Sequence, residues 1–174
     1  MMSHILEVYF NLNEDLFMLD SMMEAMLKTI VKFAPVAIAE PENYEARANL
    51  MWCSSWAING FINGGRRKAW SCHPMEHELS AIYDIAHGHG LAILTPRWME
   101  YCLEESNAHR YVSLGVNVFG IDPKGEPMAI AKECIERMRE FMSVTLNLPY
   151  TFTEVGIKRE DFATMARKAC RYGA

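Results

Sequence analysis

Apolar residues recur at helical spacing over most of the chain. Over residues 16–33 one stripe follows the i, i+3, i+4, i+7 rule, and its members are Leu16, Leu19, Met22, Met23, Met26, Leu27, Ile30 and Phe33. Pro35 and Pro41 predict the end of this helix, because proline donates no backbone hydrogen bond. A second helix is expected over 44–62, with a stop at residues 63–65, Asn-Gly-Gly.

The second half of the chain continues the helical pattern. The expected helices cover 73–85, 91–104, 126–146 and 161–171, and 109–119 is a shorter, more ambiguous apolar stretch. His-Gly-His-Gly at 87–90 interrupts the periodicity. No segment alternates convincingly at period two, so few strands are expected. The pattern predicts an all-α, multi-helix bundle domain of seven or eight helices.

The composition suits one folded domain. Of the 174 residues, 51% are hydrophobic and 22% charged, and a chain of this length buries roughly 70% of its unfolded surface. The 13 methionines fall mostly on apolar stripes, so we interpret them as core residues and not as metal ligands. The longest apolar runs fall far short of the about 20 residues of a membrane span, and the N-terminus lacks the basic region of an export signal. We therefore expect a cytoplasmic protein without membrane association.

Charge and cysteine content argue against three further classes. The net charge is -5, and the dense basic cluster is confined to Arg66-Arg67-Lys68, so a nucleic-acid binder is not expected. The 5 cysteines form no Cys-x-x-Cys pair, which disfavours a disulfide framework and a cysteine-based zinc finger. Reduced, mostly buried thiols fit the cytoplasm.

Histidines form the densest polar feature of an otherwise apolar region. Four of the 6 histidines lie between residues 73 and 89: His73, His77, His87 and His89. Neutral imidazole is a common ligand of transition metals. His73 and His77 share a helix face, whereas His73 and His87 would lie about 21 Å apart on an unbroken helix. The two can bind one ion if the chain turns between them, and the break at 87–90, with His87 starting the next helix, provides that turn.

A rival motif overlaps this cluster. Residues 73–77 fit the H-x-x-E-H pattern of inverted zinc proteases, in which His73 and His77 would bind zinc and Glu76 would act as the base. The match is short and contains Pro74. We therefore favour a metal site that includes both His73 and His87.

Residues 73–99, HPMEHELSAIYDIAHGHGLAILTPRWM, resemble the signature of the iron-containing (group III) alcohol dehydrogenases, with the butanol-dehydrogenase-like branch closest. The resemblance extends to 43–52 and 148–157 and spans nearly the whole chain. It implies the helical C-terminal half of a two-domain enzyme. The α/β half, which binds NAD(P) in that family, is expected to be absent here. The sequence contains no glycine-rich phosphate loop after a strand, and only Gly64-Gly65 has adjacent glycines.

The same resemblance implies a ligand set. The family binds a divalent metal through one Asp and three His, and His4, His73 and His87 take the places of the three histidines. The position of the Asp falls directly before Met1. His77 matches a histidine beside the metal and near the nicotinamide, so the resemblance gives it cofactor contact and a catalytic role as proton relay.

The implied reaction is reversible hydride transfer between an alcohol or aldehyde and NAD(P), with Fe(II) or Zn(II) as Lewis acid. Residues 1–174 then form a single helical metal-binding domain, truncated at both ends. For this chain alone we expect weaker metal binding than in the intact enzyme and negligible dehydrogenase activity.

The alternative is an inactive helical relic or interaction module that binds no metal. In either case an apolar face that once met the nucleotide domain would favour self-association, so a homo-oligomer is expected. Trp56 and Phe61 are candidates for the pocket lining, with ordinary core packing as the competing interpretation.

Overall fold

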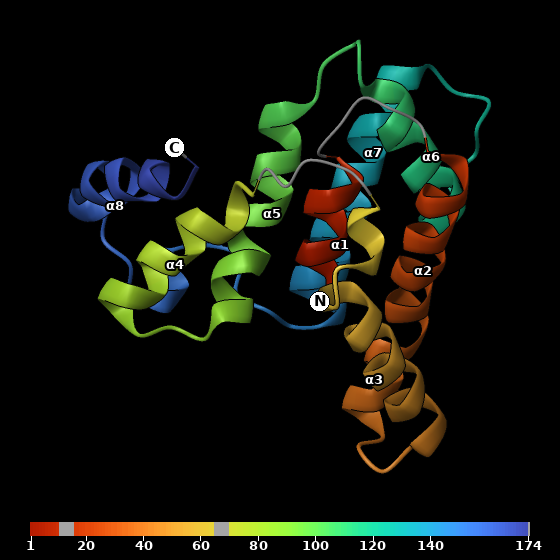
Figure 1. Ribbon diagram of the computed structural model, residues 1–174, viewed down its shortest axis with the longest axis horizontal. Helices are drawn as coiled ribbons and strands as arrows, with labels where there is room; N and C mark the ends of the chain where they lie inside the picture. Colours follow the sequence, from red (N-terminus) through yellow and green to blue (C-terminus); the bar gives the residue numbers. More distant parts are fainter. Residues whose placement is uncertain (11–15, 65–69, 174) are drawn as a thin grey trace.

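The computed structural model describes residues 1–10, 16–64 and 70–173, and every regular element in these ranges is a helix (Figure 1). The α-helices are α1 (Met2–Tyr9), α2 (Phe17–Ala39), α3 (Tyr44–Ile58), α4 (Cys72–Tyr83), α5 (His87–Cys102), α6 (Ala108–Phe119), α7 (Pro127–Glu140) and α8 (Phe162–Ala169). Short 3-10 helices cover Phe61–Asn63, Thr153–Val155, Arg159–Asp161 and Cys170–Gly173, and a π-helical turn covers Phe141–Thr145. The all-α prediction is confirmed.

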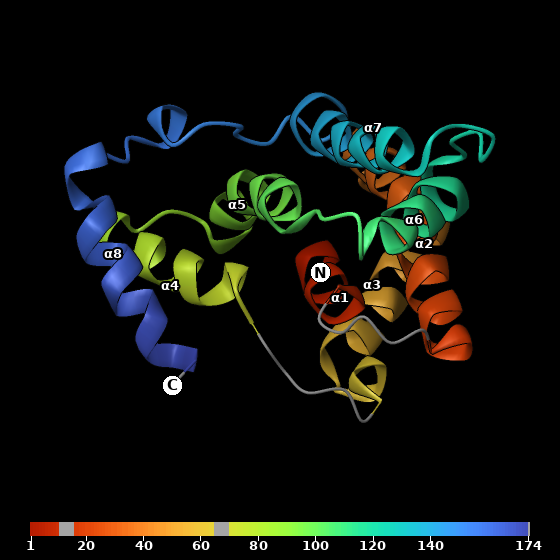
Figure 2. The ribbon, with the colours of Figure 1, turned by 90° about the horizontal axis from the view of Figure 1, so that it is seen from above.

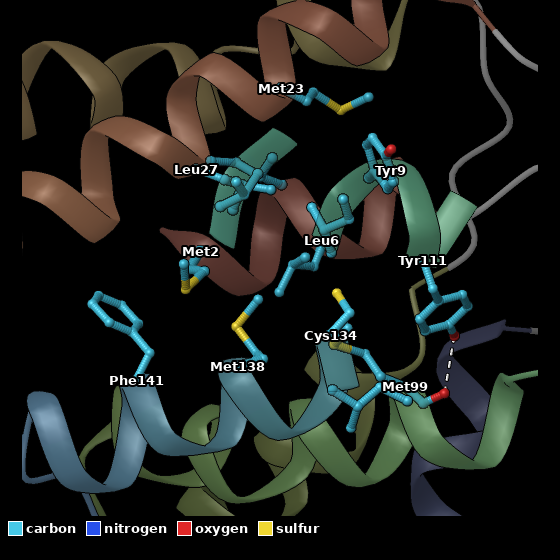
Figure 3. Close-up of a cluster of buried hydrophobic side chains, with 14 of the residues drawn as sticks. Met2, Leu6, Tyr9, Met23, Leu27, Met99, Tyr111, Cys134, Met138 and Phe141 are labelled. Carbon is cyan, nitrogen blue, oxygen red and sulfur yellow. Dashed lines mark hydrogen bonds between the residues drawn. The ribbon is translucent and has the colours of Figure 1, made fainter. Parts of the chain in front are cut away.

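Helix α1 forms the centre of the main core. Figure 3 shows it between α2 on one side and α7 on the other, with side chains from all three helices filling the space between them. The labelled core side chains are Met2, Leu6, Tyr9, Met23, Leu27, Met99, Tyr111, Cys134, Met138 and Phe141. All residues of α1 except His4 are buried, so this helix is surrounded by its neighbours on nearly all sides. Four of these core residues are methionines, as the sequence predicts.

A smaller core joins α4 to α8. Leu79, Ile157 and Met165 are buried together there, apart from the main cluster. Figure 2 shows α8 beside α4 at one end of the molecule, connected to α7 by a long segment of mostly irregular chain. Since α4 packs on both α5 and α8, this small core holds α4 in place next to the main bundle.

Pro35 does not end the helix predicted over 16–33, which corrects the prediction. Helix α2 continues through Pro35 to Ala39, and the N–H of Glu40 still donates to the carbonyl of Val36 at 2.8 Å. A proline removes a single hydrogen bond from the helix, and α2 packs along α3, so tertiary contacts offset that loss.

The helix predicted over 44–62 ends earlier than predicted. Helix α3 stops at Ile58, because Gly60 adopts a left-handed conformation with φ 88° and turns the chain into a 3-10 helix. The Asn43 side chain caps the start of α3 by accepting the N–H of Ala46 at 3.0 Å. Gly65 and the basic cluster at 66–68 lie outside the described residues.

The break among the histidines lies slightly before its predicted place. Helix α4 ends at Tyr83, residues 84–86 form the turn, and α5 begins at His87. Gly88 and Gly90 are therefore helical, which corrects the interruption predicted at 87–90, while the position of His87 at a helix start is confirmed. Asp84, with φ 53°, lets the chain reverse after α4.

The remaining helices follow the sequence pattern. The ambiguous stretch at 109–119 is helix α6, and the helix predicted over 126–146 is α7 with a π-helical turn at its end. The last predicted helix is shorter, since 3-10 turns flank α8 on both sides. Among the described helices, none has the length and apolar content needed to cross a bilayer.

Candidate metal centre

Three helices bring together the three histidines that the resemblance selects. His4 lies on α1, His73 in the first turn of α4, and His87 at the first position of α5. The Nδ1 atom of His4 and the Nε2 atom of His73 are 3.2 Å apart. The ring centroids of His73 and His87 are separated by 5.4 Å. The fold thus places residues 69 and 14 positions apart in the sequence side by side.

The other histidines occupy different surroundings. His77 is exposed one turn after His73, and its ring stacks on that of His87 with centroids 5.6 Å apart and 28° between the planes. His109 lines a separate pocket of about 260 Å³ that also contains Arg110. His77 therefore borders the cluster, whereas His109 lies elsewhere in the molecule.

A buried glutamate on α1 holds His73. Glu7 is 1% exposed, and its Oε2 atom contacts Nδ1 of His73. Its other oxygen accepts the backbone N–H groups of Ser71, at 2.8 Å, and of Cys72. These N–H groups open α4, so the carboxylate also satisfies donors that the helix start leaves unpaired.

A second buried glutamate holds His87 in the same way. Glu76, on α4, is fully buried, and its Oε2 atom contacts Nδ1 of His87. Its Oε1 atom accepts the hydroxyl of Ser80. Gly90 of α5 passes directly over this carboxylate, since a Cβ there would lie 2.6 Å from Cγ of Glu76.

The contacts of these two carboxylates with the histidines were not predicted from the sequence. A signal was present, because Glu7 follows His4 by three positions and Glu76 follows His73 by three positions. At that spacing a carboxylate shares a helix face with the histidine before it. Glu7 contacts His73 and Glu76 contacts His87, and neither pairing follows from helical spacing.

The environment keeps His4 neutral. Burial, followed by the neighbouring His73, lowers the pKa of His4 to about 4. A neutral imidazole has the lone pair that a metal needs. Burial also raises the pKa of the neighbouring Cys72 thiol, with the nearby Glu7 adding to the shift, so that sulfur stays protonated at neutral pH.

The tryptophan that packs on the site histidines is Trp70, and not the predicted Trp56. Trp70 packs edge-on against His4 and His73, at centroid distances of 5.2 and 4.8 Å. Trp56 and Phe61 instead line a groove of about 380 Å³ between α2 and α3, together with Met22, Met26 and Trp52. None of the site histidines lines that groove.

His4 and His73 have the spacing of two ligands of one divalent transition metal. Two nitrogens bound to one ion at about 2.1 Å are about 3.0 to 3.4 Å apart for coordination angles of about 90° to 109°. The 3.2 Å between His4 and His73 falls inside that interval. The carboxylates engage Nδ1 of His73 and of His87, so the Nε2 atom of each ring is available to an ion.

The close group of possible ligand atoms found among the described residues shares only His87 with the three histidines that the resemblance selects. Glu76, His77 and His87 have possible ligand atoms within 4.8 Å of one another. In this structure Glu76 is engaged by His87 and Ser80, and it is fully buried. The protease-like motif gains no support here, because a buried carboxylate paired with His87 is poorly placed to activate water.

The comparisons with known proteins agree with this architecture. The model of the Fe-containing alcohol dehydrogenase family, C-terminal, matches residues 1–173. The NADH-dependent butanol dehydrogenase A of Clostridium acetobutylicum is 49% identical over 170 residues, which are 98% of this chain and 43% of that protein. The chain thus spans less than half the length of this relative.

Solved structures show the same fold. The crystal structure of NADH-dependent butanol dehydrogenase A from Thermotoga maritima matches with a TM-score of 0.89 and 36% identity, over 98% of this chain and 42% of that one. The aldehyde reductase YqhD from E. coli matches with a TM-score of 0.89 and 27% identity, over 99% and 44% of the two chains.

Proposed function

Because the chain belongs to the Fe-containing alcohol dehydrogenase family and matches its C-terminal part, we propose that it forms the metal-binding half of an NAD(P)-dependent alcohol dehydrogenase. The substrates are alcohols and the corresponding aldehydes, interconverted by hydride transfer. The similarity to two enzymes whose names state butanol dehydrogenase activity supports this class of substrate.

The observation that carries the proposal is the convergence of His4, His73 and His87 from three helices. We assign these three side chains as ligands of Fe(II) or Zn(II), both of which accept imidazole nitrogen. When bound, the ion acts as a Lewis acid on the oxygen of the alcohol or aldehyde.

His77 supplies the proton chemistry in this proposal. Its ring is exposed and stacked against His87, which places it beside the ligand set and open to a substrate. An imidazole nitrogen can accept a proton and donate it again, so we assign His77 to take the alcohol proton as the hydride leaves and to return it in the reverse direction. The same position suits contact with a nicotinamide ring.

The nucleotide-binding part lies outside this chain in the proposal. The described ranges contain no strand, and a dinucleotide fingerprint needs a strand, a glycine-rich loop and a helix in succession. Relatives include NADH-dependent and NADPH-dependent enzymes, so we propose NAD(P) without choosing between the two. We further infer a cytoplasmic homo-oligomer, and the five unpaired cysteines support a reducing compartment.

Metal titration of variants tests the ligand assignment. We expect His73→Ala and His87→Ala each to abolish uptake of Co(II) or Zn(II), measured by calorimetry and elemental analysis. His89→Ala is the matched control, two positions from His87 on the same helix, and should bind as the parent does. Equal losses in all three variants would contradict the assignment.

Two further results separate the proposal from its alternative. A parent chain that takes up no stoichiometric metal after incubation with Fe(II) or Zn(II) would indicate a relic or interaction module. The purified chain should also show negligible oxidation of NADH or NADPH with butanal, because the proposal places the hydride donor's binding site elsewhere. Robust turnover by this chain would refute the proposal that the hydride donor binds elsewhere.

A further inference from the structure

Two buried carboxylates form a repeated arrangement around the histidine cluster. Glu7 and Glu76 are 1% and 0% exposed. Each lies three positions after one site histidine and contacts Nδ1 of the next, His73 or His87. Two independent copies of one contact, made from different helices, point to a common purpose.

The contacts determine which ring nitrogen carries the proton. A carboxylate accepts hydrogen bonds and donates none, so Nδ1 of His73 and Nδ1 of His87 must each donate. A neutral ring that carries its proton on Nδ1 has a lone pair on Nε2. In both rings the lone pair is therefore on the nitrogen that the carboxylate does not engage.

The surroundings of Glu76 restrict its movement. Its Oε1 atom accepts the Ser80 hydroxyl, and Gly90 of α5 lies against its side chain. Glu76 therefore reaches His87 from a fixed position on α4. His87, with a side chain 46% exposed, would otherwise have freedom to rotate.

We propose that Glu7 and Glu76 are positioning residues that hold His73 and His87 as Nδ1–H tautomers and orient Nε2 toward a divalent transition metal. This inference rests on the proposed ligand set. Carboxylates that accept a proton from a ligating histidine fix its orientation and increase its basicity, and their loss typically weakens metal affinity about 10- to 100-fold.

The two glutamates differ in what else they support. Glu7 also accepts the N–H groups of Ser71 and Cys72, so its replacement loosens the start of α4 as well. Among the described residues, the hydrogen-bond partners of Glu76 are the side chains of Ser80 and His87, and no backbone group. Variants at Glu76 are therefore the cleaner test.

Zinc affinity of a variant series provides the first measurement. We expect Glu76→Leu, which removes the acceptor, to weaken Zn(II) binding about 10- to 100-fold, measured by competition with a chromophoric chelator. Glu76→Gln keeps an acceptor without its charge and should fall between this variant and the parent. Glu78→Gln is the control, because Glu78 is also buried on α4 but pairs with Lys168.

Nitrogen NMR of the metal-free chain provides a second measurement that needs no ion. Long-range ¹H–¹⁵N spectra distinguish the two neutral tautomers of each histidine. We expect the Nδ1–H form for His73 and His87 in the parent, and loss of that preference at His87 alone in Glu76→Leu. This spectroscopic change does not follow from a general loss of stability.

The outcomes distinguish this inference from the proposed function. A parent chain that binds no zinc but shows both Nδ1–H tautomers would contradict the ligand set. It would still support the inference that Glu7 and Glu76 set the tautomers of His73 and His87. Zinc affinity of Glu76→Leu within twofold of the parent, or an Nε2–H tautomer at His87 in the parent, would overturn the inference itself.

Discussion

Gly90 is the residue whose small size matters most at the candidate site. A Cβ at this position would lie 2.6 Å from Cγ and 2.8 Å from Oε1 of Glu76. Glu76 is fully buried and hydrogen-bonded on both oxygens, so it has little room to retreat. Close packing of α5 on α4 therefore depends on glycine here.

We expect Gly90→Ala to lower the free energy of unfolding by about 1–3 kcal/mol, because an extra carbon in a filled core forces neighbours aside. The control is Gly88→Ala on the same helix, where a Cβ would meet nothing within 4 Å. Alanine at that open position should raise the free energy of unfolding by up to about 1 kcal/mol. Urea denaturation checks both, and equal effects of the two substitutions would refute the argument.

The sequence shows which histidines and glutamates share a helix face, but not which of them make contact between helices. The histidine and glutamate positions are visible in the sequence, and their spacing of three or four shows which pairs share a helix face. The contact from Glu7 to His73 spans 66 positions, so it depends on how α1 and α4 pack and not on local spacing.

At the scale of elements, a buried ion pair joins three helices. Arg110, on α6, donates to both carboxylate oxygens of Asp20 on α2, at 3.2 and 3.0 Å. It also donates to the carbonyl of Tyr9, the last residue of α1, at 3.1 and 2.6 Å. The C-terminus of a helix carries partial negative charge, which favours a cation at that position.

We expect Arg110→Ala to lower the free energy of unfolding by about 3–5 kcal/mol, because removing one partner leaves the Asp20 charge buried without its guanidinium. Arg137→Ala provides the comparison, since Arg137 pairs with Glu133 on the exposed surface of α7. That change should stay within about 0.5 kcal/mol. Thermal or urea unfolding measures both, and a small effect at Arg110 would show that the pair contributes little.

The helix boundaries show where local rules were sufficient. The apolar stripes located most helices, because helical periodicity acts within a few residues. Pro35 was misjudged, since packing of α2 on α3 outweighs the hydrogen bond that proline lacks. The end of α3 was placed too late because Gly60, inside an apolar stretch, provides the stop.

At the scale of the whole molecule, α3 presents an apolar stripe to solvent. Tyr44, Met51 and Ile58 are spaced by seven residues and are 85%, 69% and 70% exposed. Trp52 beside them is 67% exposed. An apolar stripe of this kind is typical of a surface that contacts another protein surface.

We expect the purified chain to self-associate through this stripe and Met51→Lys to weaken the association at least about tenfold, because a charge replaces an apolar contact. Sedimentation velocity over a range of concentrations measures the effect. Glu126→Gln is the control, since it changes the net charge equally at an exposed position away from α3. A parent chain that stays monomeric at high concentration would contradict the expectation.

The sequence by itself determined the helical class, most helix positions and the histidine cluster at 73–89, because helical periodicity and i+3 or i+4 spacing are local properties. His4 was selected by the family resemblance and not by spacing. The tertiary structure decided that His4 approaches His73, and that two carboxylates engage the Nδ1 atoms of His73 and His87. Those contacts join segments far apart in the chain, and their geometry follows from how α1, α4 and α5 pack around a common core.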